Sequence, residues 1–348
     1  MKICHVLWGL TYGGIETMVV NIANEQSALG HEVHLLIIND KIDKPMLKLI
    51  SPEVKFHCAK RHEGSKSPLS IFNINAILFR INPDITHFHH VKMHKYVLPF
   101  LRKKWCTTHH IDCVPQLQPF MAGNPNLFSI SNLVRKDILE KTGVESEVVL
   151  NGIDARKFRK SEAAYDNRNS FRIVQVGRLD KGQKGQHILI EAAKILKDRD
   201  VNFIVDFIGD GISREELQEM ICNNKLEERV RLTGAKSPEY IWENLAGYDL
   251  LVQPSLYEGF GLTIAEGMAA HIPVLVSDIE VQLEVTDNGR CGYNFRSGDP
   301  VDCADEIQAI ISDYSRAIDV ADKGLERVMD VYDVRVTASN YIEKYRNL

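Results

Sequence analysis

Short apolar runs alternate along the chain with longer stretches whose apolar residues recur every three or four positions. The runs, rich in β-branched residues, predict strands at 2–8, 32–38, 54–58, 84–88, 106–109, 127–130, 146–150, 171–176, 202–208, 229–233, 249–253 and 273–276. The longer stretches predict helices at 15–29, 185–197, 213–224, 238–246 and 261–270 and through the last fifty residues. Such alternation is typical of parallel sheets built from βαβ units.

The two series of strands are separated by residues 151–170, which are polar and lack strong periodicity. A chain of 348 residues is also too long for one ordinary hydrophobic core. We therefore expect two facing, doubly wound α/β domains, residues 1–155 and 156–330. In such folds ligands bind in the crevice at the carboxyl ends of the strands.

Composition narrows the class of protein. The chain is 44% hydrophobic and 26% charged, as expected for a globular protein, and no apolar run approaches the length of a membrane span. The N-terminus leads directly into a predicted strand without a signal-peptide pattern. Seven cysteines without a C-x-x-C pair do not indicate a disulfide framework or a zinc site, so we expect a cytoplasmic protein.

Two carboxylates, Glu258 and Glu266, lie in a glycine-rich segment between a predicted strand and a predicted helix. Seven residues separate them, and Gly259 and Gly261 are among these. A turn that leads into a helix N-terminus can hold an anion, and carboxylates accept hydrogen bonds from hydroxyl groups. A site that can bind phosphate at one end and hydroxyl groups at the other predicts a nucleotide sugar as the ligand.

A basic glycine-rich loop follows the predicted strand 171–176. Arg178, Lys181 and Lys184 lie in it, at positions where cations and backbone amides can face a diphosphate. Taken alone, the loop is equally compatible with an ordinary solvated turn. The acid pair further along the chain favours the diphosphate interpretation.

Paired glycines, Gly13 and Gly14, lie between the first strand and the first helix. They would allow the backbone to approach a ligand closely, although a tight turn that needs positive φ is an alternative. The pattern is not G-x-G-x-x-G, so it gives little support to a dinucleotide site.

Histidines gather at two predicted strand ends. His109 and His110 both qualify as residues that orient a substrate hydroxyl, and spacing alone does not choose between them. The cluster 86–94 includes His90 and His94, which could ligate a metal if helical, but no H-E-x-x-H motif or cysteine accompanies them. A wall of the ligand crevice is the favoured interpretation of that cluster.

Residues 94–105 mix apolar, aromatic and basic side chains and could rest on an anionic membrane surface. Pro99 weakens the argument for an amphipathic helix. An ordinary helix that covers the sheet and ends in basic residues is the slightly favoured alternative.

Together these motifs resemble family-4 retaining glycosyltransferases of the GT-B fold, which has two facing Rossmann-like domains. The resemblance spans nearly the whole chain and rests on the segments GGIET, THH, SISNLVRKDI, LNGID, VGRLDKGQKG, FIGDGISREEL, VRLTG and PSLYEGFGLTIAEGMA, in that order. The last segment is highly specific, because it contains the family's E-x7-E pair.

The resemblance assigns roles to these residues. It implies that Glu266 holds the ribose hydroxyls, that Glu258 holds a hydroxyl of the donor sugar and that Arg178 and Lys184 hold the diphosphate. His109 fits the family's T-x-H pattern best. The remaining donor-binding positions implied are Gly13, Gly14, Gly259, Phe260, Gly261 and Leu262.

The implied activity is retaining transfer of a hexose or N-acetylhexosamine from a nucleotide sugar to a sugar or lipid-linked acceptor, with a UDP-sugar favoured and a GDP-sugar as the alternative. Bacterial surface polysaccharide synthesis is the commonest setting, with peripheral contact of the first domain at the inner face of the membrane. No Asp-x-Asp lies near a strand end, so neither a metal nor another cofactor is expected. We expect no nucleic-acid partner, and a final helix over 331–348 that crosses back to the first domain.

Three departures and two alternatives stand beside this interpretation. Gly267 replaces the alanine usual after the second glutamate, His271 stands where a glycine is usual, and Lys181 is an extra basic residue in the lysine loop. These changes leave the identity of the donor sugar open. A nucleotide-sugar epimerase on the same scaffold is the main alternative. A dinucleotide-dependent oxidoreductase is a third, although the first strand lacks the required glycine motif.

Overall fold

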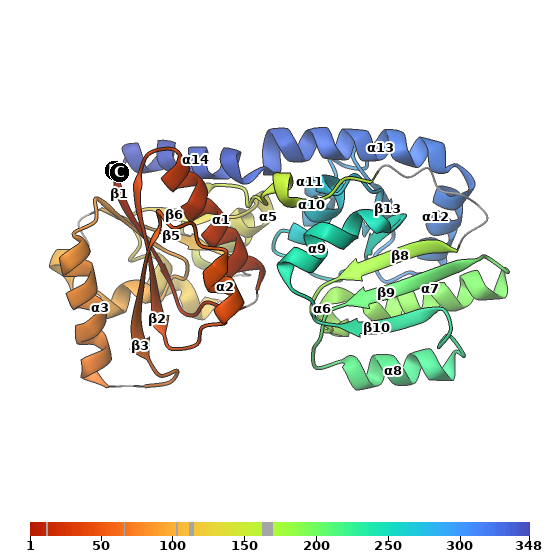
Figure 1. Cartoon of the computed structure of the whole chain (residues 1–348), viewed down its shortest axis with the longest axis horizontal. Coiled ribbons are helices and arrows are strands. Elements are labelled where there is room, and N and C mark those ends of the chain that lie inside the picture. Colours follow the sequence, from red (N-terminus) through yellow and green to blue (C-terminus); the bar gives the residue numbers. More distant parts are fainter. Residues whose placement is uncertain (12, 66, 102–103, 111–114, 162–169) are drawn as a thin grey trace. The chain divides into compact units, whose positions relative to one another are not determined.

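The computed structural model describes residues 1–11, 13–65, 67–101, 104–110, 115–161 and 170–348. The chain forms two compact units, each described by itself (Figure 1). Unit 1 comprises Met1–Ile153 and Tyr332–Leu348, and unit 2 comprises Asp154–Val331.

Unit 1 is built on a parallel sheet in the order β3-β2-β1-β4-β5-β6-β7, counted over the described residues. Its strands are β1 (Lys2–Leu7), β2 (Glu32–Asn39), β3 (Lys55–Arg61), β4 (Ile85–Phe88), β5 (Trp105–His109), β6 (Leu127–Ser129) and β7 (Glu147–Val148). The strand order reverses between β1 and β4. The carboxyl ends of these two strands therefore flank the position where doubly wound folds bind ligands.

Helices cover both faces of this sheet. They are α1 (Gly14–Ala28), α2 (Lys44–Lys48), α3 (Pro68–Ile81), α4 (Gln118–Met121), α5 (Asn132–Thr142) and α14 (Val334–Arg346). The last of these packs against α1 and adds Tyr341 and Tyr345 to the core on that face (Figure 1). The other face packs under α3, whose Ile74 and Leu78 are fully buried.

The chain leaves and re-enters unit 1 at one point. Val334 N–H donates to the Ile153 carbonyl, and Ile153 N–H donates to the Tyr332 carbonyl, each at 2.8 Å. A single π-helical turn, Val328–Tyr332, precedes this exchange. The buried carboxylate of Asp333 then caps α14 by accepting from Arg335 N–H at 2.9 Å.

Unit 2 is built on a second parallel sheet, in the order β10-β9-β8-β11-β12-β13 over the described residues. Its strands are β8 (Phe171–Val176), β9 (Phe203–Ile208), β10 (Val230–Gly234), β11 (Leu250–Gln253), β12 (Val274–Ser277) and β13 (Tyr293–Phe295). The order reverses between β8 and β11. The fold class predicted from the sequence, two doubly wound α/β domains, is confirmed.

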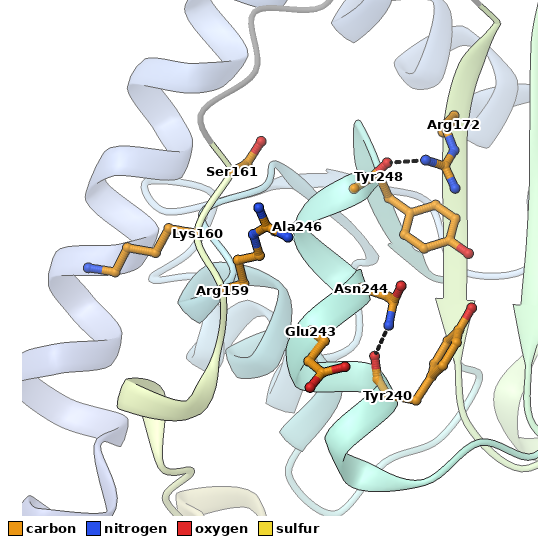
Figure 2. Close-up of a pocket in the computed structure, with 10 residues that line it drawn as sticks. Arg159, Lys160, Ser161, Arg172, Tyr240, Glu243, Asn244, Ala246 and Tyr248 are labelled. Atoms are coloured by element: carbon orange, nitrogen blue, oxygen red, sulfur yellow. Dashed lines mark hydrogen bonds between the residues drawn. The ribbon is translucent and has the colours of Figure 1, made fainter.

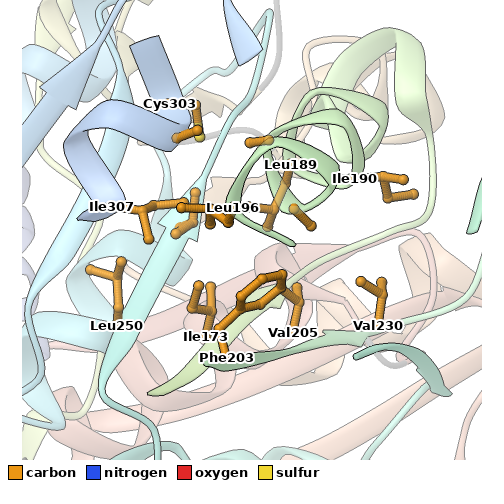
Figure 3. Packing of buried hydrophobic residues seen from close by; sticks show 14 of the residues in the cluster. Ile173, Leu189, Ile190, Leu196, Phe203, Val205, Val230, Leu250, Cys303 and Ile307 are labelled. Atoms are coloured by element: carbon orange, nitrogen blue, oxygen red, sulfur yellow. The ribbon is translucent and has the colours of Figure 1, made fainter. Parts of the chain in front are cut away.

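The helices of unit 2 complete the βαβ units. They are α6 (Lys181–Lys184), α7 (Gln186–Asp198), α8 (Arg214–Asn223), α9 (Pro238–Asn244), α10 (Leu262–Ala269), α11 (Glu280–Val285), α12 (Pro300–Ser312) and α13 (Tyr314–Arg327). Figure 3 shows how Leu189 and Leu196 of α7 and Ile307 of α12 face the β-strand residues Ile173 and Phe203.

The structure corrects two features expected from the sequence. Residues 94–105 do not form a helix that covers the sheet. The described part holds two short 3-10 turns, Met93–Tyr96 and Pro99–Leu101, followed by β5, because Pro99 interrupts helical hydrogen bonding. Arg102 and Lys103 lie outside the described residues. The basic loop expected after β8 is partly helical, because α6 spans Lys181–Lys184; the predicted helix 185–197 follows it as α7, Gln186–Asp198.

Gly185 is the point where two loops of unit 2 come closest. Its φ is +65°, and an added Cβ would lie 1.8 Å from the Pro254 carbonyl oxygen. Only glycine fits both the left-handed conformation and this approach. The contact holds the end of α6 against the loop that follows β11.

Replacing Gly185 by alanine should therefore destabilise unit 2 by about 2–5 kcal/mol, the sum of left-handed strain and overpacking. Gly298→Ala is the matched control, because Gly298 also has positive φ, at +81°, but nothing lies within 4 Å of an added Cβ. The control should lose only about 1–2 kcal/mol. Urea unfolding of both variants, followed by circular dichroism, measures the difference, and equal losses would contradict the close approach.

Candidate active site

The carboxyl ends of β8 and β11 bring a lysine and a glutamate together in unit 2. Lys184 ends α6, Glu258 lies in the loop between β11 and α10, and the Lys184 ammonium donates to Glu258 Oε1. Both side chains are largely buried, 17% and 8% exposed. The ammonium has three N–H donors, so this bond leaves others for a second anionic partner.

Glu258 is oriented by a ladder of buried polar side chains. Its Oε1 also accepts from Ser255 Oγ at 3.1 Å and from Gln253 Nε2 at 3.4 Å. Ser277, at the end of β12, donates to the Ser255 carbonyl. These contacts hold the carboxylate at one position.

The two other cations of the basic loop behave differently from Lys184. The Arg178 guanidinium is 64% exposed; it donates to Gln183 Oε1 at 2.7 Å and lies 3.6 Å from Asp180. It can swing to a diphosphate at small cost. Lys181, which the sequence placed beside the diphosphate, pairs instead with Glu216 of α8.

Glu266 lies in the second turn of α10, half-buried on the same loop-to-helix segment. Burial raises the pKa of its carboxyl from 4.5 to about 7. Hydrogen bonds from ligand hydroxyls would favour the charged form and lower that pKa again.

The N-terminus of α10 completes this part of the site. Gly261 precedes the helix with φ +100°, and no side-chain hydrogen bond caps it. Phe260 is buried, and Gly259 separates it from Glu258. The backbone amides of Gly261 and Leu262, at a helix end that carries partial positive charge, suit an anion.

Gly13 and Gly14 lie at the equivalent place in unit 1, where α1 begins after β1. Gly13 is extended, with φ −168°, and no side-chain hydrogen bond caps the helix there. The alternative of a turn needing positive φ is therefore wrong for Gly13. An added Cβ would lie 2.4 Å from Glu16 Oε2, the end of a flexible side chain that would have to move aside.

His109 ends β5 in unit 1, His110 directly follows it, and both are buried. His110 Nε2 is 3.0 Å from His89 Nδ1. The pair that the sequence suggested as metal ligands, His90 and His94, is not the group of histidines that the fold brings together. Among the described residues, ring nitrogens of His5, His87 and His89 lie within 4.8 Å of one another, whereas His90 and His94 pack against Trp8 and Trp105.

His5 escaped notice in the sequence because it stands inside an apolar strand. Strand register could have found it, since His5 pairs with His87 across β1 and β4. Side chains at paired positions of neighbouring strands lie on the same face of the sheet.

A separate pocket of about 460 Å³ lies in unit 2 at the opposite ends of the strands (Figure 2). Arg172, the second residue of β8, donates to the Gly247 carbonyl at the edge of the pocket, and Arg159 and Tyr240 line it. None of the predicted site residues lines this pocket.

Two family descriptions match the chain. Residues 154–327 match glycosyl transferases group 1, and residues 12–157 match glycosyltransferase family 4. No helix in the described residues is long and apolar enough to cross a membrane.

Known proteins with similar sequences carry related names. A 4-α-N-acetylgalactosaminyltransferase of Campylobacter jejuni, named for a diphospho-undecaprenol-linked acceptor, is 27% identical over 80% of each chain. An α-D-kanosaminyltransferase of Streptomyces kanamyceticus is 31% identical, but the match spans 40% of this chain and 36% of that protein. The crystal structure of Anabaena HepE with UDP and glucose superimposes with a TM-score of 0.81 at 20% identity, covering all of both chains, which establishes the fold.

The raised pKa of Glu266 predicts a pH-dependent contribution to stability. The folded protein binds this proton more tightly than the unfolded chain does, so the stabilisation is present below pH 4.5 and is lost as the pH rises through 7. Glu266→Gln removes the titrating group. Its gain in unfolding free energy over the parent should be about 2–3 kcal/mol larger at pH 8 than at pH 5.

Denaturant titrations at the two pH values measure this difference. Glu228→Gln, which changes an exposed glutamate of the same unit, is the control and should show no such pH dependence. A Glu266→Gln variant that differs from the parent equally at both pH values would contradict the burial argument.

Proposed function

The chain is a family-4 glycosyltransferase of the GT-B fold, and from that premise we propose retaining transfer of a hexose or N-acetylhexosamine from a UDP-sugar to a saccharide or lipid-linked saccharide. The observation that carries the proposal is the Lys184–Glu258 contact, since it sets a cation for phosphate beside a carboxylate for sugar hydroxyls. Anabaena HepE, with UDP and glucose bound, supports the choice of UDP over GDP.

In the proposed donor complex, Glu266 accepts from the ribose hydroxyls and Glu258 from a hydroxyl of the transferred sugar. Lys184 and Arg178 bind the diphosphate, with the amides at the start of α10. The charge that develops on the leaving diphosphate is stabilised by cations already in place. These groups supply the positive charge that a divalent metal supplies in other transferases.

The transfer step that we propose retains configuration at the sugar carbon. The acceptor oxygen bonds to that carbon on the face from which the diphosphate leaves, while the carbon–oxygen bond to phosphate breaks. The acceptor proton passes to the departing phosphate oxygen, so no protein base is required. The products are the glycosylated acceptor and the nucleoside diphosphate.

The lipid-linked acceptor class also gives a purpose to an exposed apolar surface of unit 1. Leu69, Phe72 and Phe79 of α3, with Leu98 and Phe100 beside it, are between 44% and 69% exposed. We call these five residues the α3 patch. Because α3 is apolar on its buried face as well, it lacks the polar face expected of a solvent-exposed helix.

Hydrogen bonds hold the two parts of the α3 patch together, and the stretch of sequence that carries the patch is basic. Asn75 of α3 donates to the Tyr96 carbonyl at 2.9 Å and accepts from Leu98 N–H at 2.7 Å, which fixes the two segments side by side. Residues 65–104 contain seven Lys or Arg and one acid, Asp84. Exposed apolar side chains within a basic segment suit the surface of an anionic bilayer. We propose that unit 1 docks there, at the inner face of the membrane during bacterial surface polysaccharide synthesis.

The proposed reaction is tested first by ligand binding and then by transfer. In a thermal-shift panel of UDP, GDP, ADP and their sugars, UDP and a UDP-sugar should raise the melting temperature most. With that donor and a saccharide acceptor, release of UDP without added metal is expected. An isomeric nucleotide sugar without transfer would show an epimerase instead, and a panel with no shift would contradict the proposal.

Lys184→Ala tests the roles within the site. Turnover should fall by about 100-fold, as on loss of a donor that stabilises developing charge, while UDP affinity falls by tenfold or less. Lys181→Ala is the matched control, because Lys181 pairs with Glu216, and it should retain near-parental turnover. Parental turnover in Lys184→Ala would remove this residue from the mechanism.

Membrane docking is tested by Phe72→Ser/Phe79→Ser. Burial of these two rings contributes roughly 1.5–3 kcal/mol each, so binding to vesicles rich in phosphatidylglycerol should fall by at least tenfold in sedimentation assays. Ile212→Ser/Val301→Ser removes exposed apolar residues of unit 2, 89% and 51% exposed, and should bind as the parent does. Unchanged vesicle binding in the α3 variant would show that the patch serves another partner.

A further inference from the structure

Four buried polar side chains of unit 1 form a continuous row of hydrogen bonds. The Oε1 atom of Gln26, a residue of α1, lies 2.8 Å from His5 Nε2. His5 Nδ1 lies 3.0 Å from His89 Nε2, and His89 Nδ1 lies 3.0 Å from His110 Nε2. We call Gln26, His5 and His89 the histidine relay. The whole row runs from α1 through the centre of the sheet to His110, the residue that follows β5.

The histidines of this row are neutral at physiological pH. Burial lowers the pKa of His5 to about 4 and that of His110 to about 3, and it holds the pKa of His89 well below 6.5. A neutral imidazole carries one N–H and one bare nitrogen. Each ring can therefore donate to one neighbour and accept from the other.

The Gln26 oxygen sets the direction of the row. A carbonyl oxygen only accepts, so His5 must carry its proton on Nε2 and accept at Nδ1. His89 must then donate from Nε2 to His5 and accept at Nδ1. By the same step His110 donates from Nε2, which leaves its Nδ1 without a proton.

His110 Nδ1 is buried and has no hydrogen-bond partner within the part of the chain that the structure describes. An unpaired buried acceptor costs roughly 1–3 kcal/mol, so such atoms call for an explanation. The atom belongs to the residue that directly follows β5, where ligands of doubly wound folds bind. An incoming hydroxyl would supply the missing donor.

We propose that the histidine relay fixes His110 in the Nε2–H tautomer, so that its bare Nδ1 accepts a hydrogen bond from a substrate hydroxyl. His110 is then the substrate-binding histidine, in place of His109, and Gln26, His5 and His89 are positioning residues. The contact between His110 and a substrate hydroxyl rests on the proposed glycosyl transfer. The assignment of the His110 tautomer does not depend on that reaction.

A metal site is the competing interpretation of the same cluster, and the hydrogen bonds oppose it. Both ring nitrogens of His5 and of His89 already have partners within the row. His87, the third member, is held separately by Tyr345 OH at 2.6 Å and Thr108 Oγ1 at 2.8 Å. A metal bound by all three would have to break several of these bonds.

The direct test reads the tautomer of His110 by long-range proton–nitrogen correlation in the full chain labelled with 15N-histidine. The His110 signals are assigned by their loss in His110→Gln. Between pH 6 and 8 they should show a protonated Nε2 and a bare Nδ1. A protonated Nδ1, or an imidazolium, would overturn the relay, whether or not the chain transfers sugar.

Variants then test whether the relay acts through His110. His89→Phe should give His110 a mixture of tautomers and lower kcat/KM for transfer by about tenfold, the value of one lost hydrogen bond, with little change in UDP affinity. His110→Gln should lose a similar factor. The double variant should lose no more than either single variant, because the two residues act as one unit.

His57→Phe is the matched control. His57 Nε2 lies 2.9 Å from His34 Nδ1, so this variant also breaks a histidine pair of the same sheet, but one outside the row. Its tautomer spectrum for His110 and its kinetics should match those of the parent. If His89→Phe fails to fold, Gln26→Leu replaces it and should likewise give mixed tautomers. Independent, multiplying losses in His89→Phe and His110→Gln would overturn the positioning role.

The outcomes separate the two proposals. If the NMR signals show the expected tautomer but no nucleotide sugar supports transfer, the relay stands and the proposed reaction fails. If transfer proceeds normally in His110→Gln, the substrate contact of Nδ1 is wrong, while the proposed reaction is unaffected.

Discussion

Lys184 and Glu258 form an ion pair that is largely shielded from water, and such a pair is stable only when both groups keep further partners. Glu258 has Ser255 and Gln253, and Ser255 is in turn held by Ser277. The ends of β11 and β12 therefore supply the polar support of one carboxylate. The close approach of Gly185 to Pro254 brings the lysine into the same place. A cation, an acid and a helix N-terminus are thus fixed before any ligand arrives.

In unit 1 the buried polar side chains near the strand ends also keep hydrogen-bond partners, but without an ion pair. Several buried polar groups near its strand ends are neutral histidines, each able to donate once and accept once, and they bond to one another in a row that ends at His110 Nδ1. Thr108, Tyr341 and Tyr345 extend the network around His87 to α14. The last helix therefore contributes polar contacts as well as apolar packing. The two units show contrasting solutions, an ion pair in one and neutral, hydrogen-bonded histidines in the other.

The sequence predicted the parts of this structure that depend on local pattern. All the strands expected from apolar runs are present, and the E-x7-E pair does lie on a loop that enters a helix. β13 was not predicted, because the three residues Tyr293–Phe295 give too short an alternation. The grouping of His5 with His87 and the pairing of Lys181 with Glu216 depend on which strands and helices become neighbours. No periodicity within one segment contains that information.

Two of the three departures from the family pattern, Gly267 and His271, lie in the support of the site, and the third, Lys181, pairs with Glu216. An added Cβ at Gly267 would lie 2.9 Å from Val274 Cγ1 and 3.1 Å from Leu251 Cδ1, so α10 packs tightly against β11 and β12. His271 adopts φ +58°, and its ring bonds to Asp322 at 2.7 Å and to the Ser161 carbonyl at 3.2 Å. Those bonds offset the strain that a glycine would avoid. Because α10 carries Glu266, both departures act on the position of that carboxylate, and through it on how the ribose is held in the proposed complex.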